Sequence, residues 1–133
     1  MAKPKRRPAS WTVVIEGHLF TLNGERTMHY HKRARLIKTW REAAFDAARK
    51  AKVPKMTKID IVCQPCRGTR RNMADTGGHF PVAKACIDGL VDAQIIKDDG
   101  PEFVQSLTFR APYVEKGTKD RMILIINEVG VRA

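Results

Sequence analysis

The chain contains the segment Ile59-Asp-Ile-Val-Cys63 and, after a loop, the segment Pro81-Val-Ala-Lys-Ala-Cys-Ile-Asp-Gly-Leu90. The first segment is rich in β-branched residues, which favour the pleated surface of a β-strand. The second begins with a proline, which the first turn of a helix accepts, and its apolar residues recur at helical spacing. The two segments therefore predict a strand, a loop over residues 64–78 and a helix over residues 81–90.

The segments on either side complete one α+β domain. A β-branched run at residues 11–15 predicts a first strand, and residues 36–51 have the apolar stripe of an amphipathic helix with Trp40 on its buried face. Residues 103–109 and 122–126 predict two more strands, whereas the polar residues 21–35 predict a loop. This order is typical of a mixed β-sheet of about four strands packed against two main helices. We assign residues 11–133 to the domain and residues 1–10 to a basic flexible arm.

The composition limits the class of protein. The chain has 133 residues, which corresponds to one domain, and 43% of them are hydrophobic, enough for a buried core. Lys and Arg number 25 against 14 Asp and Glu, giving a net charge of +11. This charge favours a polyanion as partner and excludes an acidic disordered chain.

No apolar run is long enough to span a membrane, and the basic N-terminus lacks the apolar core of a secretory signal. Three cysteines are too few for a disulfide framework, so we expect a reducing, cytoplasmic location.

The acidic residues are concentrated in one part of this basic chain. Residues 75–102 contain six of the 14 acids but only two lysines. One interpretation is a solvated helix and loop whose acids balance nearby basic side chains. The other is a divalent-metal site within a phosphate-binding surface, because carboxylates repel a phosphate unless a hard cation such as Mg²⁺ lies between them. Lys84 and Asp88 are expected to lie one turn apart on the polar face of the predicted helix.

Other motifs give weaker signals. Cys63-Gln-Pro-Cys66 has the spacing of half a zinc site, but no second pair of ligands follows, so both cysteines are interpreted as structural. His29 and His31 flank Tyr30 and are interpreted either as nucleic-acid contacts or as solvated loop side chains. The sequence has no Ser-His-Asp order and no glycine-rich phosphate loop, which disfavours hydrolysis through a covalent serine intermediate.

A longer run carries a family resemblance. It reads Arg70-Arg-Asn-Met-Ala-Asp75-Thr-Gly-Gly-His-Phe-Pro-Val-Ala-Lys84-Ala-Cys-Ile-Asp88-Gly-Leu-Val-Asp-Ala-Gln-Ile-Ile-Lys-Asp98-Asp99. This run resembles the RusA family of Holliday junction resolvases, especially its phage-encoded branch. In that family an Arg-rich stretch precedes an Asp motif, a Lys-x-x-x-Asp helix and a closing Asp-Asp pair. The spacing from Lys84 to the final pair is similar to the family without a gap.

The resemblance implies a RusA-like fold and a Mg²⁺-dependent, structure-selective endodeoxyribonuclease that resolves Holliday junctions or related branched DNA by paired phosphodiester hydrolysis. It implies that Lys84 is the catalytic lysine, and we expect Asp75 and Asp99 to bind Mg²⁺ with Asp98 as a helper. Asp88 is expected to orient Lys84. The candidate contacts to DNA phosphates are Arg33, Arg35, Arg67, Arg70, Arg71 and Lys84. Paired cuts need two active sites, so we expect a C₂ homodimer, with no membrane partner and no small-molecule cofactor.

One departure from the family pattern keeps other functions open. The family often has a second acid two residues after the first, and Gly77 stands at that place in this chain. One alternative is therefore a catalytically weak or inactive basic protein that binds branched DNA without cutting it. A further alternative, supported only by charge, is an RNA-binding structural protein.

Overall fold

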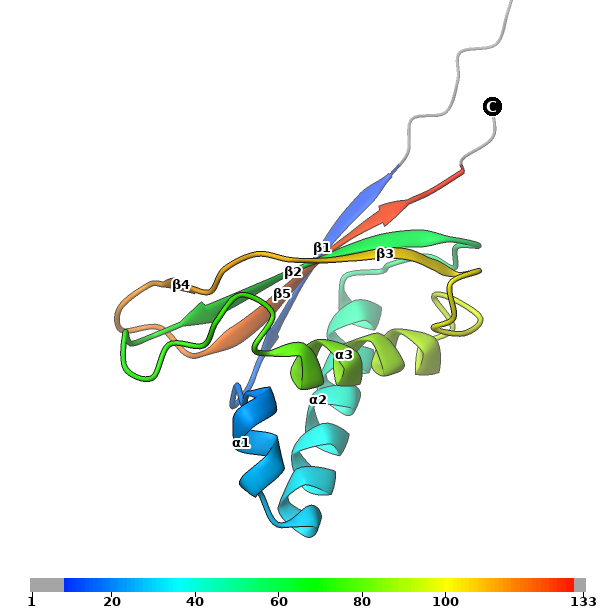
Figure 1. Cartoon of the computed structure of the whole chain (residues 1–133). Coiled ribbons are helices and arrows are strands. Elements are labelled where there is room, and N and C mark those ends of the chain that lie inside the picture. Colours follow the sequence, from blue (N-terminus) through cyan, green and yellow to red (C-terminus); the bar gives the residue numbers. More distant parts are fainter. Residues whose placement is uncertain (1–8, 131–133) are drawn as a thin grey trace, which may run out of the picture.

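The structure is a computed structural model that describes residues 9–130 (Figure 1). Its elements are β1 (Ser10–Glu16), α1 (Leu22–Thr27), α2 (Tyr30–Lys50), β2 (Ile59–Arg67), α3 (Phe80–Asp92), β3 (Val104–Phe109), β4 (Tyr113–Val114) and β5 (Arg121–Glu128). They form one α+β domain with a mixed five-stranded sheet, so the predicted fold class is confirmed. Within the described residues, no helix has both the length and the apolar character needed to cross a membrane.

β2 organises the sheet because it has neighbours along both edges. On one edge it pairs antiparallel with β5, and β5 pairs antiparallel with β1. On the other edge it pairs parallel with β3 and, at Cys66 and Arg67, with the short strand β4. The strand order is β1-β5-β2-β3, with β4 following β3 along the same edge of β2 (Figure 1).

The core lies between one face of the sheet and the helices α2 and α3. Alternate residues of β1 and β5, and most alternate residues of β2, are buried, as the two-residue period of a strand requires. Figure 1 shows α2 and α3 on the same side of the sheet, and none of the helices of residues 9–130 covers the other side. The helices fill the core with Trp40, Ala44, Ala48, Val82, Cys86 and Leu90.

Trp40 is a core residue, as its place on the apolar stripe predicts. Its side chain is 2% exposed, and the indole Nε1 donates a hydrogen bond to the backbone oxygen of His18 at 2.9 Å. A Cβ at Gly17 would lie 2.8 Å from the indole ring, so a side chain at the end of β1 would collide with α2. Glycine therefore allows β1 to finish directly against Trp40.

The predicted loop over residues 21–35 is wrong. Residues 22–27 form α1, and α2 begins at Tyr30 rather than at residue 36. Thr21 caps α1 by accepting a hydrogen bond from the backbone N–H of Gly24 at 3.0 Å, and His29 caps α2 by accepting from the backbone N–H of His31 at 3.2 Å. These turns bury none of their residues, so they lack the apolar stripe from which a helix is predicted.

The sheet is also longer than predicted. β2 extends to Arg67, so Cys66 is a buried strand residue rather than a loop residue. The short strand β4 pairs with this extension and supplies the fifth strand. Ser10, which we assigned to the arm, opens β1. The rest of the predicted arm includes residues 1–8, which lie outside the described residues.

α3 lies against α2 at Gly89, and this contact gives a test of the packing. A Cβ at Gly89 would lie 2.4 Å from the carbonyl oxygen of Arg41 and 2.8 Å from Cβ of Ala44. Alanine favours a helix over glycine by about 1 kcal/mol, but the backbone of α2 cannot easily yield. We predict that Gly89→Ala lowers the free energy of unfolding by about 1–3 kcal/mol, measured by urea denaturation.

The matched control is Gly100→Ala, because nothing lies within 4 Å of a Cβ added there. The control should unfold at the same urea concentration as the unchanged protein. Equal stability of the two variants would contradict the close approach of α2 and α3.

Candidate active site

Lys84 is the centre of an ion-pair cluster on the polar face of α3. Its Nζ donates a hydrogen bond to Oδ1 of Asp88 at 2.8 Å and another to Oδ2 of Asp99. The predicted pairing of Lys84 with Asp88 one turn away is therefore present, and Asp99 joins it from the loop after the helix. The Lys84 side chain is 44% exposed, so a ligand in solvent can reach the ammonium group.

The loop after α3 reaches Lys84 because two isoleucines anchor it. Ile95 and Ile96 are buried in the core, and the backbone oxygen of Ile95 accepts a hydrogen bond from the N–H of Met56 at 2.7 Å. The chain then returns to the surface, where Oδ1 of Asp98 accepts from the N–H of Asp99 at 2.8 Å. This short-range bond orients Asp99, and it leaves Asp98 exposed beside the cluster.

The cluster fixes the charge of its members. Partial desolvation lowers the pKa of Lys84, but the hydrogen bonds and charges of Asp88 and Asp99 outweigh it, so the pKa of Lys84 is raised above its ordinary value. The hydrogen bond from Lys84 is the main cause of a lowered pKa at Asp99. Lys84 is therefore an ammonium and Asp99 a carboxylate at neutral pH. The ion pair exists between the lowered pKa of Asp99 and the raised pKa of Lys84, and it is lost as pH falls through the first or rises through the second.

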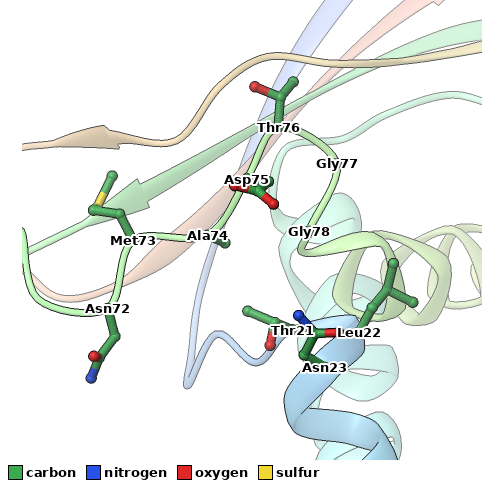
Figure 2. Close-up of a pocket in the computed structure, with 10 residues that line it drawn as sticks. All are labelled: Thr21, Leu22, Asn23, Asn72, Met73, Ala74, Asp75, Thr76, Gly77 and Gly78. Atoms are coloured by element: carbon green, nitrogen blue, oxygen red, sulfur yellow. The ribbon is translucent and has the colours of Figure 1, made fainter.

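Asp75 lies in the loop between β2 and α3 and lines a cavity of about 490 Å³. Figure 2 shows loop residues 72–78 on one side of this cavity and Thr21, Leu22 and Asn23, at the start of α1, on the other. Gly77 turns the loop at φ +85°, and the backbone oxygen of Gly78 accepts from the N–H of Leu22 at 2.9 Å. Within residues 9–130 the Asp75 carboxylate has no hydrogen-bond or ion-pair partner, and it is exposed.

The predicted site is therefore divided into two parts. The structure brings Lys84, Asp88 and Asp99 together with Asp98 adjacent, whereas Asp75 lies in the separate loop before α3. In the part of the chain that the structure describes, no three His, Cys, Asp or Glu side chains lie close enough together to hold a metal ion. The shared role of Asp75, Asp98 and Asp99 in binding Mg²⁺ remains a prediction.

Arg67 holds the Asp75 loop in place. Its Nε donates to Oδ2 of Asp120 at 3.2 Å, and its Nη1 donates to the backbone oxygens of Arg71 and Asn72, both at 3.0 Å. The side chain is only 15% exposed. Arg67 thus has a structural part in the site, beside the phosphate contact that we expect of it.

The other predicted phosphate contacts are available to a ligand. Arg70 and Arg71 are exposed in the loop after β2, and Arg33 and Arg35 are exposed near the start of α2. Arg33 makes only a loose ion pair, 3.7 Å from Glu25. Arg33 and Arg35 lie on α2, whereas the sequence predicted a loop there. The helix therefore fixes the distance between their backbone positions.

The cysteines are buried thiols. Burial raises the pKa of Cys63 to about 12 and also raises that of Cys86. The thiolate, which metal binding and redox chemistry need, is therefore disfavoured at neutral pH. This environment fits the interpretation of Cys63 as a structural residue, and Cys66, the other cysteine of that motif, is also buried.

Two residues at the start of α3 have packing that the sequence did not predict. His79, the N-cap of α3, is 2% exposed, and its Nδ1 lies 2.9 Å from the backbone oxygen of Phe20. Phe80 lies one turn before Lys84, and its ring is 6.0 Å from that of Phe109 at the end of β3. The only signal was the position of both residues immediately before Pro81, where a helix was expected to start.

No protein-family model and no curated protein matches the chain. The resemblance to the RusA family therefore rests on the motif run itself, and family membership remains a prediction.

The charge of the cluster gives a second test. We predict that the pKa of Lys84, followed by NMR titration of its side-chain carbon or nitrogen, lies above the ordinary lysine value. Asp88→Asn and Asp99→Asn should each lower it, because each removes an anionic acceptor from Nζ. Asp46→Asn, an exposed acid of α2, is the control and should leave it unchanged. If the pKa of Lys84 were the same in Asp88→Asn, in Asp99→Asn and in the unchanged protein, the cluster would not form in solution.

Proposed function

We propose that this protein is a Mg²⁺-dependent, structure-selective endonuclease that resolves four-way junctions or related branched DNA. The observation that supports this most strongly is the Lys84 cluster, in which two carboxylates hold a protonated, solvent-accessible lysine on the surface of a chain with net charge +11. The helix that carries Lys84 directly follows the loop of Asp75, whose carboxylate has no partner among residues 9–130. The Lys84 ammonium can stabilise negative charge on a phosphate, and the nearby carboxylates can bind a metal ion. Both properties are needed for metal-dependent phosphodiester hydrolysis.

Lys84 stabilises the charge that develops during hydrolysis. Negative charge grows on the phosphate oxygens and on the leaving 3′ oxygen, and a fixed ammonium group stabilises it there. Asp88 and Asp99 hold Nζ in position before the substrate arrives, so little reorganisation is needed at the moment of reaction. Asp88 acts in this proposal as a positioning residue for Lys84.

The donors that the chain offers fit magnesium when the substrate is included. Mg²⁺ prefers oxygen ligands and commonly takes one or two protein carboxylates, with water and substrate phosphates completing its coordination. The Asp75 carboxylate has no partner in the described part of the chain, and Asp99 has Asp98 beside it. When bound, the ion would neutralise the phosphate and activate the attacking water. The lack of a three-residue metal group in residues 9–130 is compatible with such a site, because the phosphate supplies the remaining ligands.

One observation favours a second candidate function, a protein that binds branched DNA without cutting it. Gly77 occupies the position of the second family acid, and it turns the loop at φ +85° where a side chain would be strained. With one carboxylate fewer, the chain could keep its arginine surface and lose metal-dependent hydrolysis. The cleavage experiment below separates the two functions.

A homodimer is part of the proposal, and the uncovered sheet face is the surface that we assign to it. This face carries Val14, which is 49% exposed, next to Ile123 in the register of β1 and β5. Ile125 of β5 is paired with Thr12 of β1 on one side and with Val62 of β2 on the other, so these three side chains lie on the same face. Among the residues that the structure describes, the centre of this face carries no charged side chain, although the chain is strongly basic, so two copies can meet there without electrostatic repulsion. The opposite, helical side then remains free for DNA.

The dimer is tested with Val14→Glu. The residue is already half exposed, so the monomer should keep its fold, whereas two glutamates at a two-fold interface repel each other. We predict that sedimentation velocity shows a dimer for the unchanged protein and a monomer for Val14→Glu. Tyr30→Glu, an exposed position on α2, should remain dimeric. A monomeric unchanged protein, or a dimeric Val14→Glu variant, would refute this interface.

The activity is tested with a labelled four-way junction in Mg²⁺ or in EDTA. We predict paired cuts near the crossover in Mg²⁺ only. Lys84→Ala should lower the rate by about 100-fold or more, and Asp75→Asn and Asp99→Asn should abolish cleavage while junction binding in a gel shift persists. Asp46→Asn, which removes an exposed acid far along α2, is the matched control and should cut at the normal rate.

Each other outcome of this assay has a meaning. Tight binding of the junction without cleavage in Mg²⁺ would establish the second candidate function instead. Normal cleavage by Asp75→Asn or Asp99→Asn would remove that residue from the mechanism. Preference for structured RNA over the junction would reject both candidates.

A further inference from the structure

Two loops that are distant in the sequence meet at one end of the sheet. One is the loop after β2, residues 68–72, and the other is the turn between β4 and β5, residues 115–120 (Figure 1). The N–H of Gly117 donates to the backbone oxygen of Gly68 at 3.3 Å. A Cβ at Gly68 would collide with the backbone oxygen of Thr118, so glycine is needed for this close approach. The fold therefore holds the two loops side by side.

Each of the two loops presents a pair of exposed cations. The four side chains, which we call the basic patch, are Arg70, Arg71, Lys116 and Lys119. Within residues 9–130 none of the four makes an ion pair. Because the two loops are in contact, the four positive charges lie on one connected surface.

The acids of the same loops do not neutralise the basic patch, because they are already engaged. The carboxylate of Asp120 accepts from Nε of Arg67 at 3.2 Å and from the N–H of Gly68 at 2.9 Å. Oε2 of Glu115 accepts from Nη2 of Arg121 at 2.9 Å. Each of these acids is balanced by its own arginine. The charge of the basic patch is therefore uncompensated and attracts a polyanion.

The composition of the two loops indicates which polyanion fits. Residues 68–72 and 115–120 contain no apolar and no aromatic side chain. A membrane surface binds apolar side chains that enter the headgroup region, and a single DNA strand binds aromatic side chains on which its bases stack. A duplex instead presents rows of phosphates, which lysine and arginine contact without reading the sequence. The basic patch therefore fits the backbone of a duplex.

The basic patch lies next to the candidate active site. Arg71 precedes Asp75 by four residues in the same loop, and Arg67 donates to the backbone oxygen of Arg71 and so fixes this stretch. We propose that the basic patch binds the phosphate backbone of a double-stranded arm of branched DNA, beside the strand that reaches Asp75. This inference rests on the proposed function, which supplies DNA as the ligand. It adds Lys116 and Lys119 to the contacts expected from the sequence.

The test measures binding of a labelled linear DNA duplex and a labelled four-way junction to the full chain in EDTA, by fluorescence anisotropy at several salt concentrations. The double variant Lys116→Gln/Lys119→Gln removes half of the basic patch. We expect it to bind the duplex and the junction about tenfold more weakly at low salt, because an arm of the junction is an ordinary duplex. The slope of log Kd against log salt concentration should fall by about 2, since each lost phosphate contact removes about 0.9.

The matched control is the double variant Lys50→Gln/Lys55→Gln. Both lysines are exposed, and they lie between the end of α2 and the start of β2, at the opposite end of that strand from the basic patch. The control loses the same net charge, so long-range attraction falls equally in the two double variants, whereas a local contact is lost only in the first. Both variants change exposed side chains and should unfold at the same urea concentration as the unchanged protein.

Three results would overturn the proposal. They are equal duplex affinity of the two double variants, tighter binding of an RNA duplex than of the DNA duplex, and binding of polyglutamate that is as tight as that of DNA and equally dependent on Lys116 and Lys119. A protein that cuts junctions but binds DNA equally in the two double variants would reject the basic patch alone. Duplex binding that depends on Lys116 and Lys119 in a protein that never cuts DNA would retain the basic patch and reject the nuclease.

Discussion

The close approach of α3 to α2 at Gly89 is the constraint on which the site depends. With no side chain at that position, α3 lies against the backbone of α2 at Arg41, and its apolar face is closed into the core. The ion pair between Arg41 and Asp92, with Nε 2.5 Å from Oδ2, joins the same two helices near the end of α3. The polar face of the helix must then point outward, and it carries Lys84 and Asp88.

Both ends of α3 lead into the loops that carry the remaining acids. The preceding loop carries Asp75 and is tied to α1 through Gly78 and to β2 through Arg67. The following loop carries Asp98 and Asp99 and is anchored by buried Ile95 and Ile96. A rigid helix between two anchored loops is a common way to hold catalytic groups, because loops supply reach and the scaffold supplies position. In the proposed function, a strand of DNA would bridge the two loops across the start of α3.

The sequence predicts the parts of this arrangement that rest on apolar periodicity or on short-range pairing. The stripe of residues 36–51 placed Trp40 in the core, and the four-residue spacing placed Lys84 beside Asp88. The prediction from the sequence was wrong for the helical turns that Thr21 and His29 cap. These turns bury no side chains, so they leave no apolar pattern in the sequence. The sequence also could not place Asp75, because its loop is shaped by the turn at Gly77 and by Arg67, whose own position depends on a bond to Asp120, 53 residues away in the chain. The burial of His79 depends on Phe20, which lies 59 residues away in the chain.

The central claim is that Asp75 and the Asp98–Asp99 pair act on the same phosphate although they lie in different loops. The most direct measurement replaces Mg²⁺ by Mn²⁺ in the complex of the protein with a four-way junction whose crossover linkages cannot be hydrolysed. Mn²⁺ broadens the NMR signals of nearby backbone amides. We predict that the amides of both loops broaden together at the lowest Mn²⁺ concentrations, and that without DNA they do not. Broadening that spares either loop in the complex would contradict a shared metal-dependent site.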